Sequence, residues 1–126
     1  MDISEKLQII KDAAYEVRLH LGPGFLEEVY QNALIYELKQ RGLDARKESA
    51  IPVGYKGIVV GNYRADILVD DSVIIELKAV RELTSVYEAQ LVNYLVATGV
   101  DYGFLINYGG DRYRIIRKTR LYNSPL

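Results

Sequence analysis

The sequence predicts an α/β fold in which helices flank a mixed β-sheet, with the elements in the order ααβββαββ. Three observations lead to this prediction. Apolar residues recur at helical spacing over residues 4–41. Between Ala45 and Val80, β-branched residues and alternation are punctuated by turn-forming segments, which is typical of strands. Beyond residue 80, a helical segment is followed by two strand-like segments.

The first two predicted helices have recognisable ends. The first runs from about Ser4 to Leu21, and Asp2 with Glu5 resembles a capping box at its start. Gly22 then serves as a C-terminal cap, and the proline after it cannot continue the helix. The second helix runs from about Phe25 to Arg41 and ends at the glycine that follows.

Three strands are expected next, at about 46–53, 57–69 and 73–79, with a bulge or bend at Gly61 in the second. The cluster Asp70-Asp71-Ser72 indicates a turn between the last two of these strands. They should therefore form an antiparallel hairpin.

The C-terminal part is expected to hold a helix and a second hairpin. Ser85 and Glu88 form a predicted capping box for a helix over about 85–98, which Gly99 ends. Because that helix is apolar nearly all round, we expect it to be largely buried. The segments "YGFLINY" and "RYRIIRK", joined by Gly109-Gly110, predict the final hairpin.

Composition limits the classes of function. The 126 residues suit one domain spanning 1–126, with 49% hydrophobic and 26% charged residues. The chain has no cysteine and one histidine, which excludes thiolate chemistry, a histidine metal centre and a Ser-His-Asp triad. No apolar run suits a signal peptide or a membrane span, so we expect a cytoplasmic protein with no membrane partner.

Charge gives a mixed indication about nucleic acid. The net charge of -1 and the pI of about 5.8 argue against a protein that coats DNA without sequence preference. The segment "DRYRIIRKTR" is nevertheless basic, and it could form a local stripe facing phosphates. It could equally be a solvated edge strand protected by cations. The candidate nucleic-acid-binding residues are Arg112, Arg114, Arg117 and Lys118.

The strand "SVIIELKAV" carries two charges among aliphatic residues. Glu76 and Lys78 lie two residues apart and so project from one face of the strand. If the turn has three residues, Val69 pairs with Val73 and Asp66 lies opposite Glu76, with Cβ atoms about 4.5–5.5 Å apart. Such carboxylates repel unless one is protonated or a cation lies between them. A hard divalent ion such as Mg²⁺ fits this arrangement, and an edge-strand ion pair is the alternative.

Two helices contribute further polar candidates. Glu27 falls at the rim of the apolar arc of the second helix, so it should point toward the interior, where it needs a partner; the alternative is an N-terminal capping carboxylate. Glu28 falls on the polar side and should be solvated. Gln90 and Tyr94 share one face of the third helix. They should either bond to the sheet or orient a water or phosphate beside the acidic cluster.

The ordered motifs resemble a known family. They are "GFLEEVY", with Gly24, Glu27 and Tyr30, then "RADILV", "IIELKAV" and "AQLVNYL". This set resembles the GxxExxY family of the PD-(D/E)XK nuclease superfamily and covers residues 21–117. Ala65 stands where a proline usually precedes the aspartate, which leaves the carboxylate ligand unchanged.

The resemblance implies a restriction-endonuclease-like core with metal-dependent phosphodiesterase chemistry. It implies that Mg²⁺ or Mn²⁺ is held by Asp66, Glu76 and the backbone carbonyl of Leu77. Glu27 would bind the metal directly or through water, and Lys78 would position or help deprotonate the attacking water. The residues so implied in catalysis are Glu27, Asp66, Glu76, Lys78, Gln90 and Tyr94.

The sequence therefore predicts a small nuclease that cuts phosphodiester bonds in DNA or RNA. Because its net charge is low, we expect it to depend on a protein partner, a homodimer or a special nucleic-acid structure. A non-catalytic module that keeps the fold and binds nucleic acid or protein is the alternative. A structural oligomer, in which the acidic cluster is an ion-pair network without a ligand, is a third reading.

Overall fold

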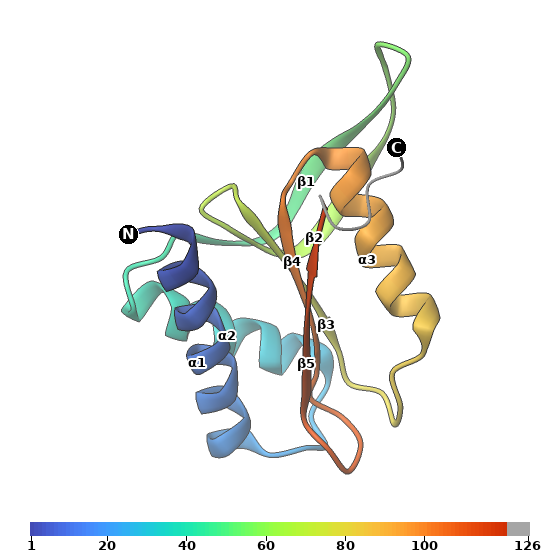
Figure 1. The fold of residues 1–126 in the computed structure, drawn as a ribbon. Helices are drawn as coiled ribbons and strands as arrows, with labels where there is room; N and C mark the ends of the chain where they lie inside the picture. The colour runs from blue at the N-terminus through green and yellow to red at the C-terminus, as the bar shows by residue number, and fades with distance from the viewer. Residues whose placement is uncertain (121–126) are drawn as a thin grey trace.

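The computed structural model describes residues 1–120 and shows the predicted mixed sheet flanked by helices (Figure 1). The helices and strands follow the order ααβββαββ, as predicted. The three helices in the described chain are α1 (Ile3–Leu21), α2 (Glu27–Gln40) and α3 (Ser85–Thr98). The five strands there are β1 (Ala45–Tyr55), β2 (Ile58–Val69), β3 (Val73–Lys78), β4 (Tyr102–Asn107) and β5 (Arg114–Thr119).

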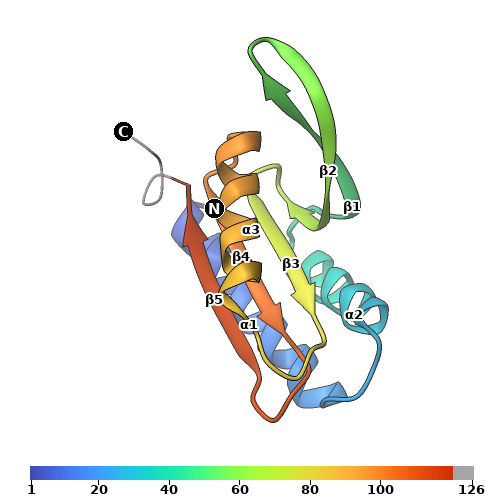
Figure 2. The same cartoon turned by 90° about the vertical axis from the view of Figure 1, so that its right-hand side faces the viewer.

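The strands form one sheet in the order β1-β2-β3-β4-β5. All neighbours pair antiparallel except β3 and β4, which are parallel because α3 connects them. Figure 2 shows α3 on one side of the sheet and α1 on the other. Both predicted hairpins are present, and the β1–β2 register shifts beside Gly61, where the bulge was expected. None of the helices within residues 1–120 is long and apolar enough to cross a membrane.

Each face of the sheet has its own apolar core. On the face covered by α1 and α2, buried residues of both helices pack against alternate residues of β2, β3 and β4. On the other face, α3 contributes only Leu91 and Leu95 to the buried cluster. The expectation that the third helix is largely buried is therefore wrong, because its residues Val86, Tyr94 and Val96 are 61%, 37% and 39% exposed.

Most helix ends match the predicted caps. Asp2 accepts a hydrogen bond from the Glu5 N–H at 2.8 Å, and Gly22 closes α1 at a φ of 66°. The predicted capping box of Ser85 and Glu88 is wrong. Ser85 already lies inside α3, whose N-cap residue makes no side-chain capping bond, and Glu88 pairs with Lys118 instead.

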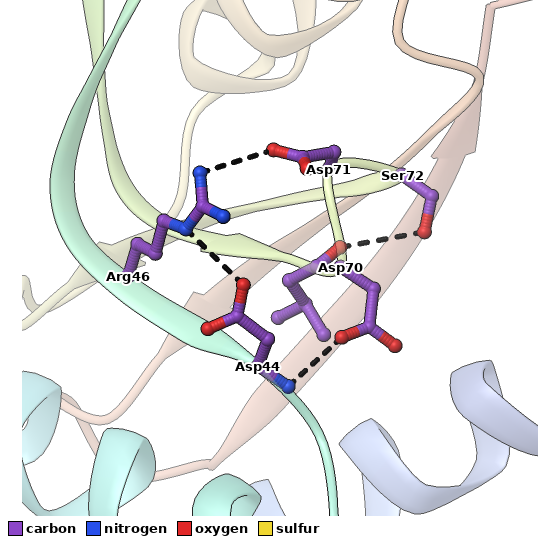
Figure 3. Close-up of polar contacts among 6 residues, drawn as sticks. Asp44, Arg46, Asp70, Asp71 and Ser72 are labelled. Atoms are coloured by element: carbon purple, nitrogen blue, oxygen red, sulfur yellow. Dashed lines mark hydrogen bonds and ion pairs between the residues drawn. The ribbon is translucent and has the colours of Figure 1, made fainter.

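The β2–β3 turn fixes the alignment of the two strands. Asp70 and Asp71 both adopt left-handed backbone conformations, at φ 50° and 55°, which aspartate tolerates better than most residues. Figure 3 shows the contacts that residues at the start of β1 make with this turn. The Asp44 N–H donates to Asp70 Oδ1 at 2.8 Å, and the Arg46 side chain contacts both Asp44 and Asp71. The turn contains three residues, so Val69 pairs with Val73, as predicted.

Candidate active site

Two carboxylates meet where β2 and β3 stop pairing. The last pair of the ladder is Ile67 with Ile75, and the next positions are Asp66 and Glu76. At these positions the backbone N–H groups bond to carboxylate oxygens instead of backbone carbonyls. The Leu77 N–H donates to Asp66 Oδ2 at 2.8 Å, and the Asp66 N–H contacts Glu76 Oε1 at 3.4 Å. The structure therefore brings the two predicted acidic residues together at the parted ends of two strands.

A kink in β2 turns Asp66 toward β3. Ala65 and Ile67 should share a face by strict alternation, yet Ala65 packs in the α3 core and Ile67 in the opposite core. On the neighbouring strand, Glu48 has a φ of 49°, and the β1–β2 ladder lacks a pair between Lys47–Ile67 and Ser49–Ala65. The alternation thus changes phase at Asp66, and its carboxylate lies beside β3 rather than inside either core.

The electrostatic environment disfavours the negative charge of both acids. Burial raises the pKa of Asp66, although the Leu77 N–H and Lys78 oppose that rise. Burial and the neighbouring Asp66 raise the pKa of Glu76 to about 7. Two partly buried carboxylates that favour protonation form a site where a cation would relieve repulsion.

A tyrosine of β2 holds one of these acids. The Tyr63 hydroxyl donates to Glu76 Oε1, and its ring stacks on Tyr94 of α3 with centroids 3.8 Å apart. Burial and the adjacent carboxylate raise the pKa of Tyr63, so it remains a protonated donor. Simple alternation places Tyr63 and Asp66 on opposite faces because they are three residues apart, which is why the sequence did not indicate this contact.

Lys78 lies on the α3 side of the sheet and contacts an aromatic ring. Its Nζ lies 4.7 Å from the ring centroid of Tyr87, and within residues 1–120 it makes no ion pair with either carboxylate. Gln90 is exposed rather than buried, which corrects the expectation, because only one edge of α3 faces the sheet. A cavity of about 30 Å³ is lined by Tyr63, Glu76, Lys78, Tyr87, Gln90, Leu91, Tyr94 and Leu105.

The segment "GFLEEVY" fixes the loop that leads into α2. Gly24 has a φ of 109°, a conformation that only glycine adopts readily. The Tyr30 hydroxyl donates to the Gly22 carbonyl at 2.6 Å and accepts from the Phe25 N–H at 3.2 Å. Tyr30 also stacks against Tyr108, so the loop that precedes α2 is fixed from two sides.

Glu27 is the first residue of α2 and lies at the margin of the site. Partial burial raises its pKa, and it interacts with the charges of Lys78 and Asp66. It is exposed rather than directed into the interior, as are Glu28 and Val29 in the same turn of α2. The adjacent Glu28 is solvated, as expected, and pairs with Lys47 at 3.3 Å.

The oxygen atoms of this site fit a hard divalent cation. Within residues 1–120, no three histidine or acidic side chains are grouped closely enough to hold a metal by themselves. The N–H and C=O groups of a strand residue face the same side, so the Leu77 carbonyl faces β2 beyond the last ladder pair. Asp66, Glu76 and this carbonyl form the kind of ligand set that Mg²⁺ completes with water and phosphate oxygens.

A buried glutamine supports Asp66 from the other face. Gln31 of α2 is 8% exposed, and its Nε2 donates to the Asp66 carbonyl at 2.8 Å. It lies one helical turn after Glu27 and so faces the same side of α2. That spacing was the signal in the sequence that could have identified Gln31.

The four predicted basic residues do not share one surface. Lys118 forms an ion pair with Glu88 at 2.9 Å on the α3 side. Arg117 faces the other side of β5 and lines a cavity with Lys11, Phe104 and Ile115. Arg112 and Arg114 instead line a different cleft together with Arg81.

The mixed sheet and its acidic cluster at two parted strands define a restriction-endonuclease-like fold. Residues 4–119 match the PD-(D/E)XK nuclease superfamily, and the chain belongs to that superfamily. No curated protein matches the chain.

Two solved structures resemble this one. The structure titled "Crystal structure of SSO0001" has a TM-score of 0.57 at 17% identity, with 94% of this chain and 78% of that chain covered. An alkaline exonuclease, LHK-Exo from Laribacter hongkongensis, has a TM-score of 0.48 at 17% identity, with 74% and 55% covered. At this level of identity, the likeness to SSO0001 concerns the fold alone.

Proposed function

We propose that the protein is a metal-dependent nuclease of the GxxExxY family that hydrolyses phosphodiester bonds in DNA or RNA, using Mg²⁺ or Mn²⁺. The observation that carries this proposal is the pair of partly buried carboxylates, Asp66 and Glu76, at the end of the β2–β3 ladder. Their raised pKa values mark a site whose burial outweighs the compensating charge nearby. Lys78 on the same strand supplies a cation beside them.

Each side chain has a distinct role in this proposal. Asp66, Glu76 and the Leu77 carbonyl hold the ion, which when bound stabilises charge on the phosphate and lowers the pKa of water. The Leu77 N–H keeps Asp66 in place. Lys78 orients the attacking water or the phosphate with its ammonium group.

The surrounding residues position this core. Tyr63 orients Glu76 by its hydrogen bond, and Tyr94 supports the Tyr63 ring by stacking. Gln90 lines the same cavity and is exposed enough to contact substrate. Glu27 acts through a metal-bound water, since it lies at the margin of the site.

The setting of this activity is also proposed. Residues 1–126 act as a single nuclease domain in the cytoplasm, and a second copy or a protein partner contributes specificity. A binding module that keeps the fold without cleavage is the second candidate. It is favoured by one observation, which is that within residues 1–120 only two acidic side chains meet at the ladder end.

Metal titration and cleavage together test the proposal. Mn²⁺ and Mg²⁺ binding by calorimetry should be present in the wild type and lost in Asp66→Asn. The same samples should then be incubated with single-stranded, duplex and branched DNA and with RNA. We expect cleavage by the wild type only. Equal cleavage in Asp66→Asn would refute the assignment, and metal-independent retention of oligonucleotide without cleavage would establish the binding module.

The two adjacent glutamates of α2 provide a matched pair. Glu27→Gln should lower the cleavage rate, because Glu27 interacts electrostatically with Asp66 and Lys78. Glu28→Gln alters a solvated residue of the same turn that pairs with Lys47, and it should retain the wild-type rate. Equal rates in the two variants would remove Glu27 from the site.

A further inference from the structure

A second cleft lies beside the proposed active site. It has a volume of about 410 Å³ and is formed by the loop between β3 and α3 and the loop between β4 and β5. Figure 2 shows both loops at the same end of the sheet. The lining residues are Arg81, Glu82, Leu83, Asn107, Asp111, Arg112 and Arg114.

The three arginines of this cleft, Arg81, Arg112 and Arg114, have no ion-pair or side-chain hydrogen-bond partner among residues 1–120. Other arginines of the described chain do pair with carboxylates, namely Arg41, Arg46 and Arg120. Glu82 and Asp111 also line the cleft, yet neither pairs with the arginines. Three free guanidinium groups in one cleft provide bidentate donors suited to phosphate.

The walls of the cleft are fixed by a buried asparagine. Asn107 is 2% exposed, and its Oδ1 accepts from the Val80 N–H at 3.0 Å and the Gly109 N–H at 3.1 Å. Its Nδ2 donates to the Val80 carbonyl at 2.9 Å, so one side chain ties both loops together. A Cβ at Gly109 would lie 2.6 Å from the Ala79 carbonyl carbon, which shows how closely the loops pack. The cleft is therefore preformed.

The cleft and the active site lie along one row of the sheet. Lys78 pairs with Asn107, and Asn107 pairs with Arg114, so the three residues are neighbours across β3, β4 and β5. Because neighbouring strands lie about 4.8 Å apart, the backbone positions of Lys78 and Arg114 are separated by about 10 Å. Residues directly opposite each other share a face, so a nucleic-acid strand bound at Lys78 can continue to Arg114.

We propose that this cleft binds a phosphate of the substrate strand next to the one that is cut, with Arg81, Arg112 and Arg114 as its donors. The inference rests on the proposed nuclease function and makes it more specific, because the ligand is the backbone of a nucleic acid rather than a mononucleotide. Glu82 and Asp111 oppose phosphate entry and limit the affinity.

Salt dependence of binding tests the cleft. The probe is a fluorescently labelled single-stranded DNA oligonucleotide, measured by anisotropy in EDTA over a range of salt concentrations. Each phosphate contact contributes about 0.7 to the slope of log K against log salt for single strands. Arg81→Ala and Arg114→Ala should each weaken binding and lower the slope, by no more than that amount because both arginines contact the same phosphate. Asp111→Asn should tighten binding.

Arg117→Ala is the matched control, because Arg117 is an exposed arginine of the same strand that faces the other side. It should keep the wild-type slope. If Arg117→Ala lowers the slope as much as Arg114→Ala, the basic stripe is correct and the cleft is wrong. Slopes that stay at the wild-type value in both Arg81→Ala and Arg114→Ala would also overturn the proposal.

Turnover of two substrates separates this inference from the proposed function. Bis(p-nitrophenyl) phosphate is too small to reach from the carboxylates to the cleft, whereas an oligonucleotide spans both. In Arg114→Ala, the ratio of oligonucleotide to ester turnover with Mn²⁺ should fall about tenfold. A wild-type ratio in that variant overturns the cleft and leaves the nuclease intact. Wild-type protein that cleaves neither substrate overturns the nuclease, and the slopes alone then decide the cleft.

Discussion

The two ends of the β2–β3 hairpin treat their acidic residues in opposite ways. At the turn, Asp70 accepts the Asp44 N–H at 2.8 Å and pairs with Lys6 at 3.0 Å. Burial alone would raise the pKa of Asp70, but these two partners outweigh it and lower the pKa below its usual value. At the open end, burial raises the pKa of Asp66 and Glu76.

The two ends therefore differ in how their carboxylates affect the stability of the fold. Carboxylates at the turn meet donors and stabilise the backbone that contains them. Carboxylates at the open end are held together against their repulsion, which lowers the stability of the metal-free protein. Sites of this kind are typical of function, since a purely structural role would favour the better-satisfied arrangement.

The largest effect is expected from removing the ammonium group of Lys78, which lies beside the two carboxylates at the open end of the hairpin. Lys78→Met should lower the cleavage rate by about 10²–10⁴-fold, the range typical of a lost acid–base group. Mn²⁺ affinity at pH 8 should change little, because Asp66, Glu76 and the Leu77 carbonyl remain. Cleavage assays and calorimetry on the same preparation measure both quantities. Loss of metal binding together with activity would show that Lys78 maintains the structure of the metal site and does not act in the cleavage step itself.

The second effect concerns stability and uses the same end. Glu76→Gln should stabilise the metal-free protein at pH 8 by about 2 kcal/mol, since each unit of pKa shift corresponds to about 1.4 kcal/mol and partial exposure reduces the sum. The sign follows from the raised pKa. The unfolded chain loses this proton near pH 4.5 and the folded one near pH 7, so wild-type stability falls between those values.

Chemical unfolding in EDTA measures this effect. The free energy of unfolding of Glu76→Gln should exceed that of the wild type increasingly as the pH rises from 4.5 to 7, and the two should not differ in this way at lower pH. Saturating Mn²⁺ should reverse the order at pH 8, because only the wild type gains stability from the bound ion. A variant less stable than the wild type in EDTA at pH 8 would contradict the comparison of the two ends.

The sequence predicts the turn end better than the open end. Three polar residues mark the turn, and counting residues from it aligns Val69 with Val73 and places Asp66 and Glu76 next to each other beyond the last ladder pair. Tyr63 could not be placed this way, because the backbone changes phase at Asp66, opposite the left-handed Glu48. That change depends on β1, which is remote in sequence.

Two other differences arise from tertiary packing. The buried residues of the apolar third helix are Leu91 and Leu95 alone, so composition overstated its burial. The basic segment of β5 divides by alternation between two faces, with Arg114 on one side and Arg117 on the other. Composition reports how many charges a segment holds, whereas the strand period determines which of them meet.

The smallest effect is expected at the turn. Asp70→Ala removes the acceptor of the Asp44 N–H and the partner of Lys6, and it places alanine at a φ of 50°. Urea unfolding should show a loss of about 1–2 kcal/mol. Asp70→Asn, which keeps an acceptor and tolerates this backbone, should lose less. The loss should shrink as pH falls below 3.8, because the stabilising carboxylate is then protonated in the wild type. Mn²⁺ affinity should be unaffected, and a parallel loss of affinity would show that the turn holds Asp66 against Glu76.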